Sequence, residues 1–369
     1  MSAREPLRVV YHLAVDAARA EARAEVLARE QTVEVPRAVV RDAIVRGEAL
    51  GRVEALREDP GGGFRATLAY PIGATGLDPA QLLNVVFGNS SLHADVRCLD
   101  LEPGAELASA LGGPRFGIAG LRAAAGVAGR PLTCTAIKPM GLSTAALASL
   151  AGCFARAGVD FVKDDHGLAD QPWSPFRERV AACLAAIARA AEETGHRPVY
   201  VPNLIGTPER MRDAQRFAED AGARAVMASP MLVGLPAFWE LCRRSSVPVL
   251  AHPAFAGTLR FAPEALFGKL FRLYGADAAI FVSFGSRFAQ GEDACRAVAE
   301  ALRRPWAGLR PALPVPAGGI ELASASKLVE FYGSDAMLLV GGDLQLEADR
   351  VLERSRDFVR SVHAAAARA

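Results

Sequence analysis

One short stretch, residues 158–166 (GVDFVKDDH), constrains the fold of this 369-residue chain more than any other. It begins as an apolar strand and ends in the charged run Lys163-Asp164-Asp165-His166. Side chains alternate along a strand, so Lys163 and Asp165 point to one side and Asp164 to the other. Burying such charges is costly without a partner or a metal ion. The pattern is typical of the C-terminal mouth of a parallel barrel, and a solvated surface strand is the alternative.

From about residue 120 the sequence alternates between short apolar strands and helices. The expected strands are 132–138, 161–165, 199–204, 225–228, 248–252, 278–283, 314–317 and 336–340. Eight such units in about 250 residues match a (β/α)8 barrel. A doubly wound sheet is the alternative, but the strand count and the lack of a G-x-G-x-x-G after the first strand disfavour it.

The first 120 residues have a different pattern. Strands are expected at 7–15, 51–57, 64–72 and 96–101, and helices at 17–29 and 78–87. The turn Asp59-Pro-Gly-Gly-Gly63 joins two of these strands as a hairpin. We therefore predict a small α+β, ferredoxin-like domain over residues 1–120, followed by the barrel over 121–369.

Charge and apolar patterning exclude several functions. The 42 basic and 41 acidic residues nearly cancel, so nothing indicates binding to nucleic acid or to a membrane surface. No uninterrupted apolar run is long enough to span a bilayer, and no apolar leader segment is present. The six cysteines are scattered singly, as in a reduced protein. We expect a cytoplasmic protein.

If the barrel forms, the residues just after its strands are the candidates for chemistry. Lys138 follows the first strand and could act as a general base or stabilise an oxyanion. His252 ends the fifth strand. The pairs Gly318-Gly319 and Gly341-Gly342 follow strands 7 and 8, where bare backbone N–H groups can bind a phosphate. A solvent-facing lysine and ordinary tight turns are the alternatives.

Several of these motifs, in this order and spacing, resemble one family. They are Thr135-Ala-Ile-Lys-Pro139 with Gly141-Leu-Ser143, residues 158–165 with Gln171-Pro172, Pro314-Val-Pro-Ala-Gly-Gly-Ile320, and Val340-Gly-Gly342. Together they resemble the RuBisCO large subunit, and specifically the RuBisCO-like proteins (form IV). The resemblance implies a homodimer, or a larger assembly, in which each active site takes residues from the partner's N-terminal domain.

The resemblance also implies residue roles. Lys163 corresponds to the lysine that CO2 converts to a carbamate, and Asp165 to a second ligand of Mg2+. His166 stands where the family has a glutamate, and imidazole is a poorer ligand for a hard cation. Lys138 and His252 correspond to active-site residues. The residues expected from the neighbouring subunit are Glu30 and Asn89.

Other family positions are lost. An arginine is replaced by Pro253, two histidines by Ala256 and Phe281, a serine by Ala317, and the mobile-loop lysine by Phe288. Arg287 is adjacent to that last position and is a further candidate for substrate binding. The arginine, the strand-6 histidine and the serine hold one phosphate in the carboxylase, whereas the glycines that hold the other phosphate are retained.

The losses argue against carboxylation and for one phosphate on the ligand. We expect a Mg2+-dependent enzyme that enolises, or cleaves beside, the ketone of a phosphorylated sugar or sugar acid. A decarboxylase, transcarboxylase or hydrolase of 3-oxo-isoapionate 4-phosphate is favoured, because residues 30–36 do not match the methionine-salvage pattern. The alternatives are a methionine-salvage enolase or isomerase acting on a methylthio-pentulose phosphate, and a non-catalytic binding or regulatory protein, which His166 suggests.

Overall fold

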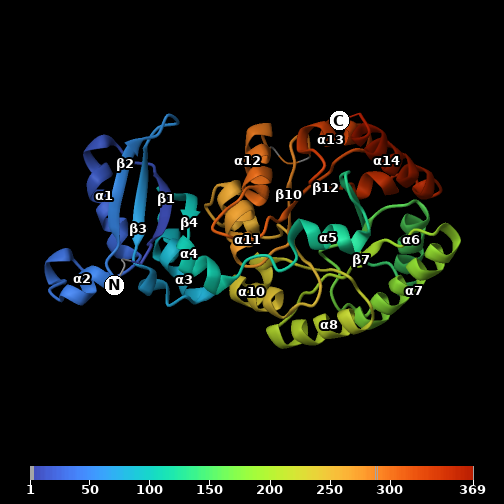
Figure 1. Ribbon diagram of the computed structural model, residues 1–369, viewed down its shortest axis with the longest axis horizontal. Helices are drawn as coiled ribbons and strands as arrows, with labels where there is room; N and C mark the ends of the chain where they lie inside the picture. Colours follow the sequence, from blue (N-terminus) through green and yellow to red (C-terminus); the bar gives the residue numbers. More distant parts are fainter. Residues whose placement is uncertain (1–3, 287, 289, 369) are drawn as a thin grey trace.

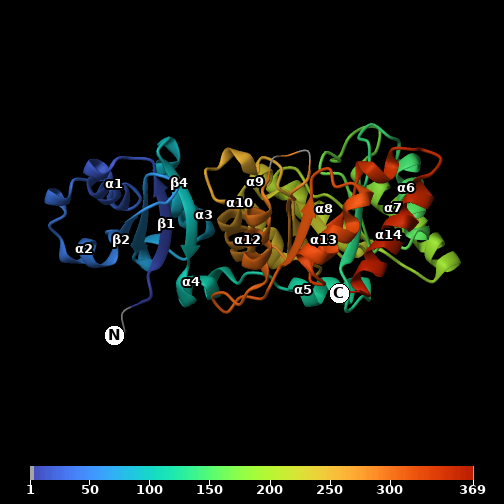
Figure 2. The same ribbon diagram turned by 90° about the horizontal axis from the view of Figure 1, so that it is seen from above.

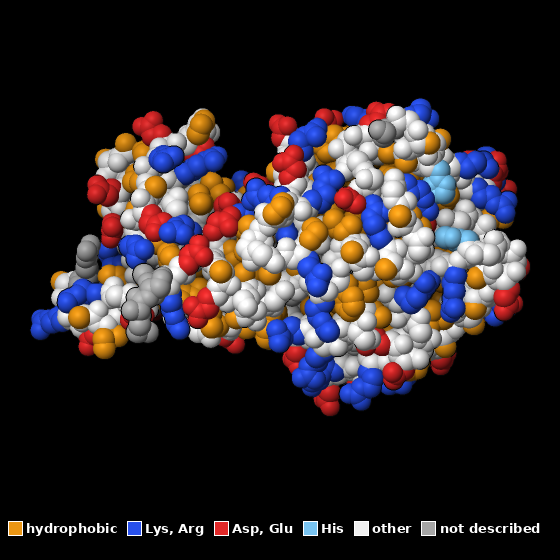
Figure 3. Space-filling view, in the orientation of Figure 1, with side chains coloured by type: hydrophobic (Ala, Val, Ile, Leu, Met, Phe, Trp, Pro, Cys, Tyr) orange, Lys and Arg blue, Asp and Glu red, His pale blue; other side chains and the backbone are white. Residues whose placement is uncertain are grey.

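The computed structural model describes residues 4–286, 288 and 290–368. Figure 1 shows a small domain of sheet and helices, in blue, beside a larger barrel that runs from teal to red. Seen from above in Figure 2, the small domain lies at one end, and the helices α6, α7 and α14 lie at the far end of the barrel. On the face in Figure 3 the basic and acidic side chains are interspersed, as the near-zero net charge predicts.

The small domain has the ferredoxin-like order that we predicted. Its main elements are β1 (Leu7–Leu13), α1 (Ala17–Glu30), β2 (Arg52–Glu58), β3 (Phe64–Tyr70), α3 (Pro79–Phe87) and β4 (Val96–Glu102). Its short helices are η1 (Arg37–Val39), α2 (Ala43–Glu48), η2 (Ile72–Thr75) and η3 (Asn89–Leu92). The sheet is antiparallel in the order β2-β3-β1-β4. Alternate residues of β1 are fully buried, which places α1 and α3 against one face.

The eight expected barrel strands are all present among the described residues. They are β5 (Leu132–Ile137), β6 (Phe161–Asp164), β7 (Val199–Val201), β8 (Val226–Ala228), β9 (Val249–Ala251), β10 (Ala278–Val282), β11 (Leu313–Ala317) and β12 (Met337–Leu339). The helical segments around and between them are α4 (Gly104–Leu111), α5 (Gly117–Ala125), α6 (Thr144–Arg156), α7 (Phe176–Thr194), α8 (Pro208–Asp220), α9 (Pro230–Val233), α10 (Leu235–Arg244), η4 (Ala256–Thr258), η5 (Glu264–Leu270), α11 (Phe271–Leu273), α12 (Glu292–Arg303), η6 (Leu322–Ser324), α13 (Ala325–Tyr332), η7 (Gly342–Gln345) and α14 (Val351–Ala366).

The strands follow one another around the barrel in chain order. They pair in parallel as β12-β5-β6-β7 and β8-β9-β10-β11. Backbone bonds from Met227 to Pro202 and from Leu204 to Met227 join β7 to β8, and β11 lies beside β12. Alternate residues of all eight strands form one separate core cluster, from Leu132 of β5 to Leu339 of β12. This cluster is the filled interior of the barrel.

The domain boundary expected between residues 120 and 121 falls inside α5. The N-terminus of α5 is attached to the barrel, because Asp277 accepts the N–H groups of Phe116 and Gly117 at 2.7 and 2.6 Å. Leu121 of α5 belongs to the interior cluster. We therefore propose that the barrel domain begins just before α5. Among the described residues no helix is long and apolar enough to cross a membrane.

One buried ion pair links β5 to β6. The carboxylate of Asp160 is fully buried. It accepts hydrogen bonds from both terminal nitrogens of Arg130, at 2.7 and 2.8 Å. The backbone N–H and the hydroxyl of Thr133 also donate to it. The pair fixes the start of β6, and therefore the height of Lys163 along the barrel.

We predict that Arg130→Met lowers the free energy of unfolding by about 3 kcal/mol, because it leaves a buried carboxylate without its cation. Urea denaturation of the purified protein measures this loss. Arg156→Met is the matched control, since it removes an exposed pair with Glu193 and should change stability much less. Equal losses for the two variants would contradict the assignment.

Candidate functional site

Strand β6 separates its charged residues as its alternation predicts. Lys163 is 2% exposed and lies on the inner side, in line with Phe161 of the interior cluster. Asp164 is fully buried on the outer side, against α7 and β7. Asp165 returns to the inner side and is 20% exposed at the mouth. The surface-strand alternative is therefore excluded.

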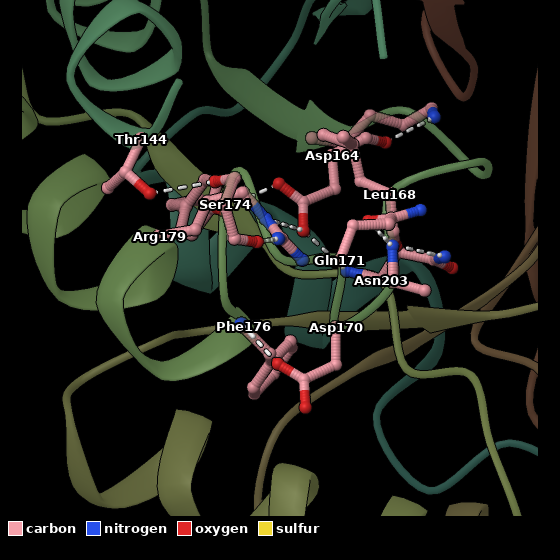
Figure 4. Close-up of polar contacts among 12 residues, drawn as sticks. Thr144, Asp164, Leu168, Asp170, Gln171, Ser174, Phe176, Arg179 and Asn203 are labelled. Atoms are coloured by element: carbon pink, nitrogen blue, oxygen red, sulfur yellow. Dashed lines mark hydrogen bonds and ion pairs between the residues drawn. The ribbon is translucent and has the colours of Figure 1, made fainter. Parts of the chain in front are cut away.

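Figure 4 shows Asp164 beside Arg179 and Asn203, two of the residues that hold it on the outer side. Its carboxylate accepts from Arg179 Nε of α7 at 3.2 Å, from the Tyr200 hydroxyl of β7 at 2.6 Å and from the Asn203 N–H at 3.1 Å. Burial, with the nearby negative charge of Asp164, raises the pKa of Tyr200 well above its usual range. Tyr200 therefore stays a neutral donor, and one carboxylate ties β6 to its two neighbours.

The loop after β6 is held by side chains on either side of it. Asn203 Nδ2 donates to the carbonyls of His166 and Leu168 at 3.0 and 2.9 Å. Gln171 donates to the Gly167 carbonyl at 2.7 Å and accepts from Ala169 N. These bonds (Figure 4) fix the backbone that carries His166.

The amine of Lys163 lies in an unusual environment. It donates to the Asp164 carbonyl at 2.8 Å. Burial lowers the pKa of Lys163, and the opposing effect of Asp165 does not cancel the shift. Burial alone would raise the pKa of Asp165, but the hydrogen bond with His166 and the charges of Lys138 and Lys163 outweigh it and hold this pKa well below its usual range. The site thus makes the amine of Lys163 easier to deprotonate than an ordinary lysine, beside a carboxylate that stays ionised.

Lys138 and two histidines complete the polar part of the mouth. Lys138 Nζ lies 3.4 Å from Asp165 Oδ1, and His166 Nδ1 lies 3.6 Å from Asp165 Oδ2. The rings of His166 and His252 stack with centroids 4.3 Å apart. Burial, and then the charge of Lys163, lower the pKa of His252 well below its usual range. His252 Nδ1 accepts the Ala254 N–H at 3.1 Å, which assigns the proton of the neutral ring to Nε2.

A cavity of about 990 Å3 opens at this mouth and brings together most of the predicted site residues. Its lining includes Lys138, Lys163, Asp165, His166, His252, Gly318, Gly319, Gly341 and Gly342. Glu30 and Asn89 are absent from the described lining and lie in the small domain, where Asn89 Nδ2 is 3.5 Å from Glu30 Oε1 and 3.2 Å from Glu34 Oε1. Arg287 lies outside the described residues.

The two glycine pairs line the cavity. Gly318 and Gly319 have φ values of +105° and +97°, which favour glycine at both positions. Within the described part of the chain, the N–H groups of these two residues and of Gly341 and Gly342 donate to no acceptor. A Cβ on Gly341 would lie 3.5 Å from Lys138 Nζ. The mouth therefore offers a set of free donors beside a cation.

Most of the remaining lining is apolar, although Gln290, Glu321 and Asp343 also line the cavity. It includes the residues that replace lost family positions, namely Pro253, Ala256, Phe281, Phe288 and Ala317. Other apolar lining residues were missed by the sequence analysis: Leu259, Phe261, Pro263, Leu266, Phe267 and Val298. These residues belong to no recognisable sequence motif. They come together only because the fold packs η5 and α12 against the segment after β9. A run of apolar residues just after a barrel strand was the one available signal.

The donor set suits Mg2+ only under one condition. The described residues contain no group of three or more His, Cys, Asp and Glu side chains that could hold a metal ion. An unmodified amine and an imidazole are poor ligands for a hard cation. A carbamate on Lys163 would place a second anionic oxygen ligand on the same face of β6 as Asp165. The buried amine with its lowered pKa fits this modification, so the residues can accommodate the metal.

A ferredoxin-like domain before a barrel whose mouth holds Lys163, Asp165 and two glycine pairs defines a RuBisCO-type protein. Residues 117–345 match the family model described as "Ribulose bisphosphate carboxylase large chain, catalytic domain". The chain therefore belongs to the RuBisCO large-chain family, and its relatives place it among the RuBisCO-like proteins. The resemblance drawn from the motifs is confirmed.

Three relatives illustrate the similarity. Ribulose bisphosphate carboxylase-like protein 1 of Rhodopseudomonas palustris is 44% identical over 98% of this chain and 99% of its own. The 5-methylthioribulose-1-phosphate isomerase of Rhodospirillum rubrum is 44% identical over 98% and 97%. A crystal structure of a Rubisco-like protein from Rhodopseudomonas palustris has a TM-score of 0.90 at 42% identity and covers 98% of both chains.

The lowered pKa of Lys163 generates a pH prediction. Between its folded pKa and about 10.4, the usual value for lysine, the unfolded chain binds more protons, so wild-type stability rises with pH. Lys163→Met removes this dependence. In CO2-free buffer with a chelator, the variant should unfold at a higher temperature than the wild type at pH 7, and its advantage should shrink towards pH 10.

Differential scanning calorimetry across this pH range measures the difference. Lys327→Met, which alters a largely exposed lysine, controls for the general loss of one lysine. A difference that stays constant from pH 7 to 10 would show that Lys163 titrates like an ordinary lysine.

Proposed function

We propose that this enzyme enolises the ketone of an alkylthio-substituted pentulose monophosphate and does not fix CO2. One observation carries the proposal: a single cavity is lined by glycines whose backbone N–H groups have no acceptor among the described residues, by many apolar side chains, and by Lys138 and His252. The reaction supported best is the isomerisation named for the Rhodospirillum rubrum relative.

The phosphate end is supported by Gly318, Gly319, Gly341 and Gly342. Backbone N–H groups that have no acceptor among the described residues can replace the hydration of a phosphate. Gly342 has open space around its α-carbon, so a phosphate oxygen can approach the backbone closely.

The opposite end favours an apolar group. A second phosphate, or the carboxylate of a branched sugar acid, would face Pro253, Phe261 and Phe281. Burying such a charge without a donor costs several kcal/mol. A methylthio group loses little hydration there, and sulfur contacts with aromatic rings are favourable.

The central groups can transfer a proton. Lys138 reaches the mouth from the end of β5 and can take a proton from the carbon beside the ketone. Its contact with Asp165 fixes its position. His252 remains a neutral imidazole at neutral pH because of its burial. Its Nε2–H can donate to a developing oxyanion, and the same ring can relay the proton to the neighbouring carbon.

We propose that carbamylated Lys163 and Asp165 would hold Mg2+. The metal, when bound, would polarise the ketone and the adjacent hydroxyl of the substrate. Lys163 must be neutral to react with CO2, and its burial favours that state. His166 stacks on His252 and contacts Asp165, so its proposed role is to orient these two side chains rather than to replace the family glutamate as an oxygen ligand.

The comparisons favour the methionine-salvage alternative over the branched sugar-acid interpretation, which rested on residues 30–36 alone. They also favour an enzyme over a non-catalytic binding protein, because the relatives include a named isomerase. The cavity agrees with both preferences. It has one polar end and retains the groups for proton transfer.

The decisive test is turnover of 5-methylthioribulose 1-phosphate, followed by NMR in D2O. We expect isomerisation with deuterium exchange at a carbon beside the ketone. Lys163→Ala should abolish both the turnover and Mg2+ binding measured by calorimetry, while its circular dichroism stays that of the wild type. Ribulose 1,5-bisphosphate should bind more weakly than the monophosphate and should not be carboxylated. Tighter binding of the bisphosphate, or full activity of Lys163→Ala, would refute the proposal.

We also propose a cytoplasmic homodimer with shared sites. Glu30 and Asn89 lie together on the small domain and away from the described lining of their own cavity. Nearby Val35, Val39 and Ile44 are 42%, 57% and 71% exposed. An apolar surface beside two polar residues suits contact with the mouth of a second copy.

Hybrid dimers test this arrangement. Glu30→Ala and Lys163→Ala subunits should each be inactive as pure dimers. A purified heterodimer should recover about half of the wild-type activity, because one of its two symmetric sites carries neither change. A heterodimer without activity would mean that each chain builds its own site.

A further inference from the structure

The wall of the cavity after β9 is joined to the small domain of the same chain. Cys98 N donates to the Arg260 carbonyl at 2.9 Å, and Ala262 N donates to the Cys98 carbonyl at 2.8 Å. The residues around Phe261 thus pair in parallel with β4, which is an edge strand of the small sheet. The wall therefore extends that sheet by one short segment.

Alternation along this segment separates its side chains. Leu259 and Phe261 line the cavity, whereas Arg260 points into the small domain. Its Nη2 donates to the carbonyls of Ser91 and His93, both at 2.5 Å, and its Nε donates to the Val96 carbonyl at 3.1 Å. Three charge-assisted bonds hold one side of the segment.

The ring of Phe261 is fixed from the small domain as well. Phe87, at the end of α3, packs against it edge to face, with centroids 5.0 Å apart at 76°. Phe87 is 4% exposed and Phe261 is 6% exposed. The position of Phe261 in the cavity therefore depends on a residue that does not line it.

We propose that Arg260 and Phe87 are positioning residues that set the depth of the apolar end, so that the small domain of each chain determines which alkylthio group its own barrel accepts. This inference rests on the proposed function. It assigns the small domain a role within its own chain, separate from the role expected for Glu30 and Asn89 in the partner's site.

The test compares kcat/KM for the methylthio and propylthio forms of the ketose phosphate. Arg260→Met keeps the aliphatic stem but loses the three hydrogen bonds to the small domain. The segment that carries Phe261 can then move to make room for the longer propylthio group. The preference of the wild type for the methylthio form should fall by at least about fivefold. The change should lie mainly in KM, because the groups around the reacting carbons are on other elements. Arg260→Lys, which keeps the charge, should restore part of the preference.

Trp239→Phe is the matched control. It removes a bond between α10 of the barrel and α4, from Trp239 Nε1 to the Leu111 carbonyl at 3.0 Å, and neither residue lines the cavity. It should leave the preference within about twofold of the wild type. An unchanged preference in Arg260→Met would overturn the inference. If that variant does not fold, Phe87→Leu replaces it with the same criterion.

A wild type that turns over neither compound would refute the proposed function, and the wall is then tested alone. Xenon occupies dry apolar cavities, so crystals under xenon should show a site beside Phe261 in the wild type. A weaker site in Arg260→Met supports the inference. Equal occupancy in the two proteins, or a wild type without this site, overturns it.

Discussion

The buried carboxylate of Asp164 is the interaction on which the mouth depends. Because side chains alternate along a strand, a shift of one residue in β6 would turn Asp164 into the cavity and Lys163 against α7. Donors from α7, β7 and the backbone after β7 all meet this carboxylate, so only one register satisfies them. Lys163 and Asp165 face the cavity as a consequence, and each remaining contact of the mouth is built on that placement.

The sequence was sufficient for the strands, their alternation and the residues at their ends, because each of these is a local property of the chain. It predicted the convergence of Lys138, Lys163, Asp165 and His252, since parallel strands of a barrel end on one face. It did not predict the apolar wall. Leu266 and Val298 reach the cavity only through the packing of η5 and α12, and that packing has no motif in the sequence. The attachment of α5 to the barrel likewise has no local signal, because it rests on the distant Asp277.

The apolar replacements at the mouth make physical sense only as a set. A single arginine left among Pro253, Phe281 and Ala317 would be a buried charge without a partner, which is costly. Conversely, one apolar replacement among retained phosphate donors would leave those donors unsatisfied. Phe281 also packs edge to face on Tyr332, with ring centroids 6.0 Å apart. This contact restricts the position of the Phe281 ring. The wall therefore acts as one unit in choosing the end of the substrate that it contacts.

Charge balance links this choice to the state of Lys163. With a neutral amine, Asp165 is the anion at the centre of the mouth, and Lys138 lies 3.4 Å from it. A carbamate on Lys163 would add a second negative charge on the same face, more than the single nearby Lys138 can balance. Two anionic oxygens in a partly buried site then require a divalent cation or a large rise in a pKa. The low pKa of Asp165 in the unmodified site rests partly on the positive charge of Lys163. A carbamate there would remove this contribution, and binding of a cation would restore it.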